Sequence, residues 1–174
     1  LSLVIIGVAC QSEQPKRYQG LVADSAMVVC AHPVASRIGI DIMRKGGNAI
    51  DAAVAVQFAL TVAFPEAGNI GGGGFMVMRH ADGKTAALDF REKAPSGASR
   101  DMYLDSAGNV IDKLSTKGSL ASGVPGSVEG MVEMHAKYGR LPWKDLVRPA
   151  IDLALNGIAL TVREAENLNH AQAK

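Results

Sequence analysis

The sequence lacks the features that mark several classes of protein. Its 174 residues carry a formal net charge of +1 and only 5% aromatic side chains, so there is no basic stripe with interleaved aromatics for binding nucleic acid. The two cysteines and four histidines show no metal-ligand spacing. No apolar run reaches the roughly 20 residues that a membrane-spanning helix needs. The composition therefore favours none of these classes.

A catalytic nucleophile is also missing. Serines and threonines are plentiful, but none lies in a nucleophile elbow or a Ser-x-x-Lys arrangement. No spacing of histidine, aspartate and serine suggests a triad. His135 continues the apolar stripe of a predicted helix, so we interpret it as a packed core histidine rather than a ligand or base. The residues alone predict no catalytic, cofactor or metal site.

The N-terminus resembles an export signal. Residues 1–9, LSLVIIGVA, are apolar and end in small residues, after which Cys10 opens a polar stretch. This pattern is typical of a signal peptide cleaved after Ala9, or of a bacterial lipoprotein signal with a lipid anchor at Cys10. A buried N-terminal strand is the alternative. We divide the chain into a signal-like segment and polar linker, 1–26, and a globular part, 27–174.

Glycine is abundant, and Gly71–Gly74 are consecutive among the 19 glycines. A phosphate-binding loop needs a strand before the glycines and a helix after them. Here a predicted helix precedes the glycines and the strand-like Phe75–Met78 follows. Two interpretations remain: a tight helix-to-strand turn, or a place where another backbone or a small polar substrate comes close.

Periodicity predicts an α+β fold. We expect a strand over Met27–Ala31, a hairpin from Gly74–His80 and Lys84–Phe90 around the turn at 81–83, and a surface excursion over Ser96–Lys117. Three helices are expected over Ala35–Gly46, over Ala49–Phe64 with Asn48 as its cap, and over Ser127–Tyr138 with Val128, Met131 and Val132 inward. Two more are expected: one from Pro142, which Pro149 breaks or restarts, and one from the capping box of Thr161 and Glu164 to Lys174.

Arg91 is the candidate ligand-binding residue. It follows a predicted strand in the stretch Asp89–Pro95, DFREKAP. Its guanidinium could hold a carboxylate in two parallel hydrogen bonds, which lysine cannot do. The alternative is a surface ion pair with Asp89 or Glu92, and this stretch alone favours that alternative because exposed pairs are common.

Five motifs in this order closely resemble the N-terminal part of the large subunit of γ-glutamyltranspeptidases (glutathione hydrolases). The resemblance covers the chain from about Met27 onward. Each motif is weak alone, but the five in register are specific. They are KGGNAIDAA at Lys45–Ala53, GNIGGGGFM at Gly68–Met76, DFREKAP at Asp89–Pro95, GVPG at Gly123–Gly126 and YGRLPW at Tyr138–Trp143.

This resemblance implies an N-terminal-nucleophile hydrolase with an αββα sandwich, of which the chain holds an incomplete front part. It implies a precursor that cleaves itself into two subunits, with the new N-terminal threonine of the small subunit as nucleophile. That threonine would lie beyond residue 174. The γ-glutamyl group of glutathione would pass through an acyl-enzyme to water or to an amino acid or peptide, without a cofactor.

The resemblance also implies a role for Arg91. In the family, the arginine of this motif binds the α-carboxylate of the γ-glutamyl group, and Arg91 is the matching residue. The location expected from the signal-like segment is the periplasm or the outer side of the bacterial inner membrane. Two alternatives remain: a cephalosporin-acylase-like amidohydrolase, and a truncated, non-catalytic carboxylate-binding domain.

Export predicts a mature protein that lacks residues 1–9. Signal peptidase would remove the apolar segment at Ala9, or lipidation would leave a modified Cys10 at the new terminus. Mass spectrometry of the native N-terminus tests this. An intact Leu1-Ser2-Leu3 end in exported material would contradict it.

Overall fold

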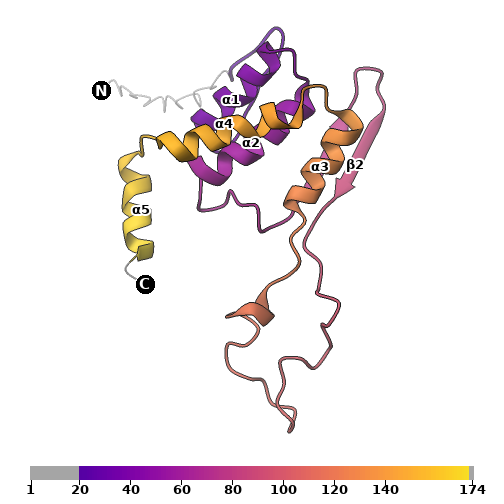
Figure 1. Cartoon of the computed structure of the whole chain (residues 1–174), viewed down its shortest axis with the longest axis vertical. Helices are drawn as coiled ribbons and strands as arrows, with labels where there is room; N and C mark the ends of the chain where they lie inside the picture. The colour runs from indigo at the N-terminus through magenta and orange to yellow at the C-terminus, as the bar shows by residue number, and fades with distance from the viewer. Residues whose placement is uncertain (1–19, 173–174) are drawn as a thin grey trace, which may run out of the picture.

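The computed structural model describes residues 20–172; the signal-like segment, Cys10 and residues 173–174 lie outside them. The described part is α+β, as the sequence predicts. Figure 1 shows helices gathered on one side, a hairpin beside one further helix, and a long excursion that projects away from both. Within residues 20–172, no helix is both long enough and apolar enough to cross a membrane.

Helix α2, Ala49–Ala63, lies at the centre of the helical group. It packs against α1, Pro33–Arg44, and against α4, Trp143–Asn156. Small side chains allow this close packing: a Cβ placed on Gly39 of α1 would lie 2.7 Å from Val56 Cγ2. On the other side, the Phe58 and Trp143 rings meet edge to face, with centroids 5.6 Å apart. The apolar α2 is thus covered on more than one face.

Helix α1 begins two residues earlier than the sequence pattern predicts. Pro33 occupies its first turn, where the missing N–H costs nothing. The ring nitrogen Nδ1 of His32 caps the helix by accepting the Val34 N–H at 3.2 Å. On the exposed side of the helix, Asp41 forms an ion pair with Arg44 at 3.2 Å.

The predicted strand at Met27–Ala31 does not form. The segment is extended and keeps its alternation, since Val28 and Cys30 face inward while Met27 and Val29 are exposed. It has no neighbouring strand among the described residues, and Val28 packs instead against the helices, close to Gly39. The prediction was wrong because apolar alternation reports one buried face and does not report a hydrogen-bonded partner.

The predicted hairpin is confirmed. Strands β1, Phe75–Arg79, and β2, Thr85–Asp89, pair antiparallel, with Phe75 opposite Asp89. Gly83 in the turn has φ 86°, a conformation that favours glycine. One face of the hairpin packs on the helical core through Met76 and Leu88. The other face is open in the described part of the chain.

Helix α3, Ser127–Tyr138, has the predicted bounds but a different inward face. Met131 and Met134 are buried, whereas Val128 and Val132 are 40% and 43% exposed. The helix turns Gly130 toward the hairpin, where a larger side chain would collide with the Phe90 ring. This contact, rather than apolar content alone, sets the rotation of α3.

Pro149 lies inside α4 and neither ends nor restarts it. The sequence interpretation was wrong here because packing outweighs the local cost of proline. Leu146 and Ala150 on either side are buried, and α4 packs against α2 along its length. The helix ends at Asn156, and its C-cap, Gly157, has φ 76°.

Helix α5, Val162–Gln172, begins at the predicted capping box. The Thr161 N–H and hydroxyl donate to Glu164 Oε2 at 2.7 and 2.8 Å. These hydrogen bonds, followed by the charge of nearby His32, hold the pKa of Glu164 below its usual value. His32 Nε2 lies 3.3 Å from Glu164 Oε1, which joins α5 to the start of α1. The stability that the hydrogen-bonded Glu164 carboxylate contributes is present above the ordinary carboxyl pKa. It is lost as pH falls through the lowered pKa of Glu164.

The excursion between β2 and α3 is irregular, as predicted for Ser96–Lys117. It contains two isolated bridges, Lys93 to Val124 and Leu104 to Val110, and a short 3₁₀ helix, Ser119–Ala121. Nearly all of its side chains are exposed. Figure 1 shows it extending well away from the helices.

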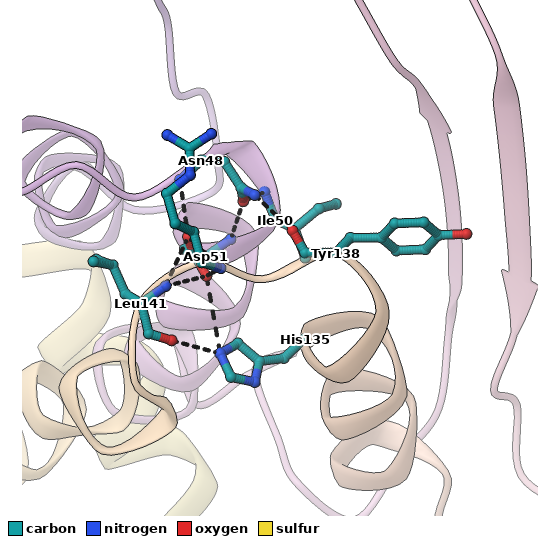
Figure 2. A network of polar contacts seen from close by, with 7 residues as sticks. Asn48, Ile50, Asp51, His135, Tyr138 and Leu141 are labelled. Carbon is teal, nitrogen blue, oxygen red and sulfur yellow. Dashed lines mark hydrogen bonds and ion pairs between the residues drawn. The ribbon is translucent and has the colours of Figure 1, made fainter.

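A buried carboxylate joins α2 to the α3–α4 connection (Figure 2). Asp51 is fully buried, and Oδ2 accepts the Asn48 N–H at 2.9 Å as part of the predicted N-cap. Oδ1 accepts the Arg140 N–H at 3.0 Å, and the Leu141 N–H is 3.4 Å from both oxygens. Asn48 also donates to the Tyr138 carbonyl at 2.6 Å. The N-terminus of α2 therefore fixes the end of α3.

Asp51→Asn should destabilise the protein by about 2–3 kcal/mol, because an amide NH₂ would face backbone N–H donors that now share a charged acceptor. The measurement is the urea midpoint of the complete protein. Asp41→Asn is the matched control: Asp41 belongs to an exposed ion pair, so its loss should cost less than about 1 kcal/mol. Equal shifts in the two variants would contradict the role of Asp51.

Candidate substrate-binding site

The candidate site lies where β2 ends and the motif DFRE begins. Side chains alternate across a strand, so Asp89 and Arg91 share one face and Phe90 points to the other. The Phe90 ring packs on the helical core with Leu88. Asp89 lies opposite Phe75 in the register of the hairpin. Phe75, Asp89 and Arg91 therefore gather on the open face.

Phe90 is held by three glycines, one from the glycine run and two from the start of α3. A Cβ on Gly74 would lie 3.0 Å from Phe90 Cε2, and one on Gly130 would overlap the ring itself. A Cβ on Gly126 would meet the Phe90 carbonyl. The Phe90 N–H donates to the Gly74 carbonyl at 3.0 Å, which extends the hairpin by one residue. The chain has little freedom at this point.

The run Gly71–Gly74 allows two backbones to approach closely. A Cβ on Gly73 would lie 2.6 Å from the Arg91 Cα. The Gly72 carbonyl accepts the N–H groups of Gly126 and Ser127 at 2.8 and 3.0 Å, at the start of α3. Of the two interpretations left open by the sequence, close backbone approach is confirmed. The glycines hold the Arg91 backbone between the hairpin and α3.

Arg91 does not form the surface ion pair that its local sequence favours. The Asp89 carboxylate accepts the backbone N–H of Arg91 at 3.0 Å instead of binding its guanidinium. The guanidinium carbon lies 5.1 Å from the centroid of the Phe75 ring. Among residues 20–172, no carboxylate forms an ion pair with Arg91. The guanidinium has its hydrogen-bonding capacity available on the open face.

A cleft of about 270 Å³ adjoins this segment on the α3 side. Its charged lining residues are of both signs: Asp89, Arg91, Lys93, Glu129 and Glu133. Glu133 accepts a hydrogen bond from Lys137 at 2.6 Å, which raises the pKa of that lysine. Lys93 is joined by its backbone to Val124 of the GVPG motif at 3.1 and 2.8 Å. Two of the five sequence motifs thus meet here.

The other residues singled out in the sequence lie elsewhere. His135 is a packed histidine, as expected: its Nε2 lies 2.7 Å from the Leu141 carbonyl and its ring packs against Trp143. The Cys30 thiol lies 3.1 Å from the Ser36 hydroxyl. Within the described part of the chain, no group of three histidine, cysteine or acidic side chains could hold a metal ion.

Sequence reasoning missed Phe75. The residue was assigned only to an apolar strand that follows the glycines. Its contact with Arg91 depends on the register that pairs Phe75 with Asp89. That register follows once the turn at 81–83 is fixed, because residues on either side of a hairpin turn pair in order. The signal was therefore present in the hairpin pattern.

Comparison with known proteins gives the same assignment as the motifs. The family model for gamma-glutamyltranspeptidase matches residues 35–174. A glutathione hydrolase proenzyme of Pseudomonas sp. (strain A14) is 49% identical over 168 residues, which is 97% of this chain and 28% of that protein. The crystal structure of Helicobacter pylori gamma-glutamyltranspeptidase superposes with a TM-score of 0.82 at 52% identity, over 89% of this chain and 44% of that one.

A cephalosporin acylase from Bacillus halodurans has a related structure, with a TM-score of 0.77 at 30% identity over 93% of this chain and 30% of that one. The fold is thus one shared by γ-glutamyltranspeptidases and acylases. The chain belongs to the gamma-glutamyltranspeptidase family. It spans under a third of the length of the Pseudomonas relative.

Gly73→Ala should destabilise the protein by about 1–3 kcal/mol, because its Cβ would press on the Arg91 backbone, which cannot move cheaply. Gly71→Ala is the matched control: a Cβ there meets nothing within 4 Å, so its effect should stay within about 0.5 kcal/mol. Thermal melting of the complete protein compares the two. Equal losses would show that close approach at Gly73 does not matter.

Proposed function

We propose that this chain is the front part of the large subunit of a γ-glutamyl transferase and glutathione hydrolase. The names of its relatives include glutathione hydrolase proenzymes, which supports a precursor cleaved into two subunits. The nucleophilic threonine would be supplied by the small subunit, which partners this chain in a heterodimer. Glutathione and other γ-glutamyl compounds are the proposed substrates.

In the proposed reaction, the threonine hydroxyl attacks the γ-carbonyl carbon of the substrate. Its proton passes to the threonine's own α-amine and then to the departing amine as the amide bond breaks. The γ-glutamyl group is left as an ester on the threonine. Water then releases glutamate, or an amino acid or peptide amine accepts the γ-glutamyl group. Apart from Arg91, the residues of this chain serve as support for that chemistry.

The observation that carries the proposal is the state of Arg91. Its backbone is fixed by Gly73 and Asp89, and its guanidinium has no carboxylate partner within residues 20–172. A guanidinium can bind a carboxylate through two parallel N–H groups, which fixes both distance and orientation. The α-carboxylate of a γ-glutamyl group is the proposed occupant. This binding would hold the γ-carbonyl at a set distance for attack.

An acylase is the second candidate, because the Bacillus halodurans acylase has a closely similar structure. Both activities could use Arg91 to bind a carboxylate, so the arginine does not separate them. The substrate amino group does. Glutaryl-p-nitroanilide keeps the carboxylate of γ-glutamyl-p-nitroanilide and lacks its amino group. A preference for the γ-glutamyl compound would favour the proposed function, and a preference for the glutaryl compound would favour the acylase.

Arg91→Met in the complete proenzyme should lower kcat/KM for γ-glutamyl-p-nitroanilide roughly 100- to 1,000-fold, because a charge-assisted bidentate contact to the substrate is lost. Arg91→Lys should recover only part of the activity, since lysine offers a point charge without the planar fork. Self-cleavage should proceed in both variants because it involves no free substrate. The measurements are initial rates and subunit processing on a gel.

Arg79→Met serves as the control, since Arg79 is an exposed arginine at the end of the same hairpin. It should leave kcat/KM nearly unchanged. The comparison substrate is 4-aminobutyryl-p-nitroanilide, which lacks only the α-carboxylate. If Arg91→Met matures normally and still prefers the substrate with the carboxylate, the proposed contact is wrong.

A further inference from the structure

The Phe75 ring lies against the guanidinium of Arg91, the candidate ligand-binding group of the site. The Arg91 guanidinium carbon is 5.1 Å from the ring centroid, inside the distance of about 6 Å at which a cation is attracted to the face of an aromatic ring. Phe75 does not belong to the helical core, because 63% of its surface is exposed.

The pairing of the two hairpin strands brings Phe75 close to Arg91. Phe75 is the first residue of β1 and pairs with Asp89, the last residue of β2. Arg91 follows Asp89 by two positions, so its side chain leaves the same face and lies diagonally from Phe75. Diagonal neighbours in a sheet are within reach when the side chains are long or aromatic. The register of the hairpin therefore sets where the guanidinium rests.

Arginine loses much rotamer freedom when it is held in one orientation. The backbone contacts at Gly73 and Asp89 fix where the side chain starts but not where the guanidinium ends. The ring supplies the second point of contact. A guanidinium that stacks on an aromatic ring keeps the N–H groups at the edge of its plane free for a carboxylate.

We propose that Phe75 is a positioning residue that holds the Arg91 guanidinium ready for a substrate carboxylate. This inference rests on the proposed function of Arg91. By ordering the guanidinium before the substrate arrives, the ring reduces the entropy lost on binding. Its effect should therefore fall mainly on KM for substrates that carry the α-carboxylate, with kcat little changed.

The test measures kcat/KM of the complete, mature enzyme for γ-glutamyl-p-nitroanilide and for 4-aminobutyryl-p-nitroanilide. Phe75→Leu should lower the ratio of the two values roughly 3- to 10-fold, because leucine keeps an apolar group and lacks the π face. Phe75→Trp should retain the ratio of the parent enzyme. Val77→Ala is the matched control, since Val77 is exposed on the same strand and the same face, and should leave the ratio unchanged.

A variant with nearly the same shape separates electrostatics from packing. Phe75→pentafluorophenylalanine keeps the ring but makes its face electron-poor, so it should lower the ratio as leucine does while folding and self-cleavage proceed. It also keeps the test decisive if Phe75→Leu fails to mature. A parallel fall with both substrates, or an unchanged ratio in the fluorinated variant, would overturn the proposal and leave Phe75 a structural residue.

Measurements in the Arg91→Met background separate the proposed function of Arg91 from the proposed role of Phe75. If Arg91→Met loses the preference for the carboxylate, and Phe75→Leu lowers it in the parent enzyme but has no further effect in Arg91→Met, both proposals are supported. If Arg91→Met keeps the preference, the proposed function of Arg91 is wrong, and so is the role of Phe75 that rests on it. If Arg91→Met loses the preference and Phe75→Leu keeps it, only the role of Phe75 is wrong.

Discussion

The buried carboxylate of Asp51 is the constraint on which the helical arrangement depends. A carboxylate removed from water costs several kcal/mol unless its oxygens are hydrogen-bonded. Asp51 finds its donors both at its own N-cap and in the connection between α3 and α4. Any packing that moved this connection would leave Oδ1 of the buried carboxylate without its donors. The network therefore selects one placement of α3 and α4 around α2.

The placement of α3 in turn fixes the hairpin. Gly130 packs against the Phe90 ring, and the N–H groups at the start of α3 donate to the Gly72 carbonyl. Backbone on both sides therefore fixes the end of β2. Arg91 follows directly after this fixed segment. Its position thus depends on interior contacts that involve neither its own charge nor any substrate. A rigid backbone with an unpaired guanidinium is what a carboxylate-binding site requires.

Local signals predicted well, and signals that depend on distant partners did not. The N-cap at Asn48 and the hairpin turn are set by neighbouring residues, and both were predicted from the sequence. The segment Met27–Ala31 reads as a strand, but strand formation needs a partner that the local sequence cannot supply. For Arg91, the residues alone favoured a surface ion pair, and the motif resemblance identified it as a ligand-binding residue. Phe75 was missed because its contact arises only after strands pair.

The hairpin also determines when the site can exist during folding. Two strands alone are marginally stable in water, and here the ring of Phe90 finds its packing against Gly130, on the far side of the exposed excursion. Bringing these two points together closes a long loop, whose entropic cost grows only slowly with its length. The contact that fixes the Arg91 backbone therefore requires α3 to be docked. The projecting excursion can vary in length at little thermodynamic cost to the site that lies at its two ends.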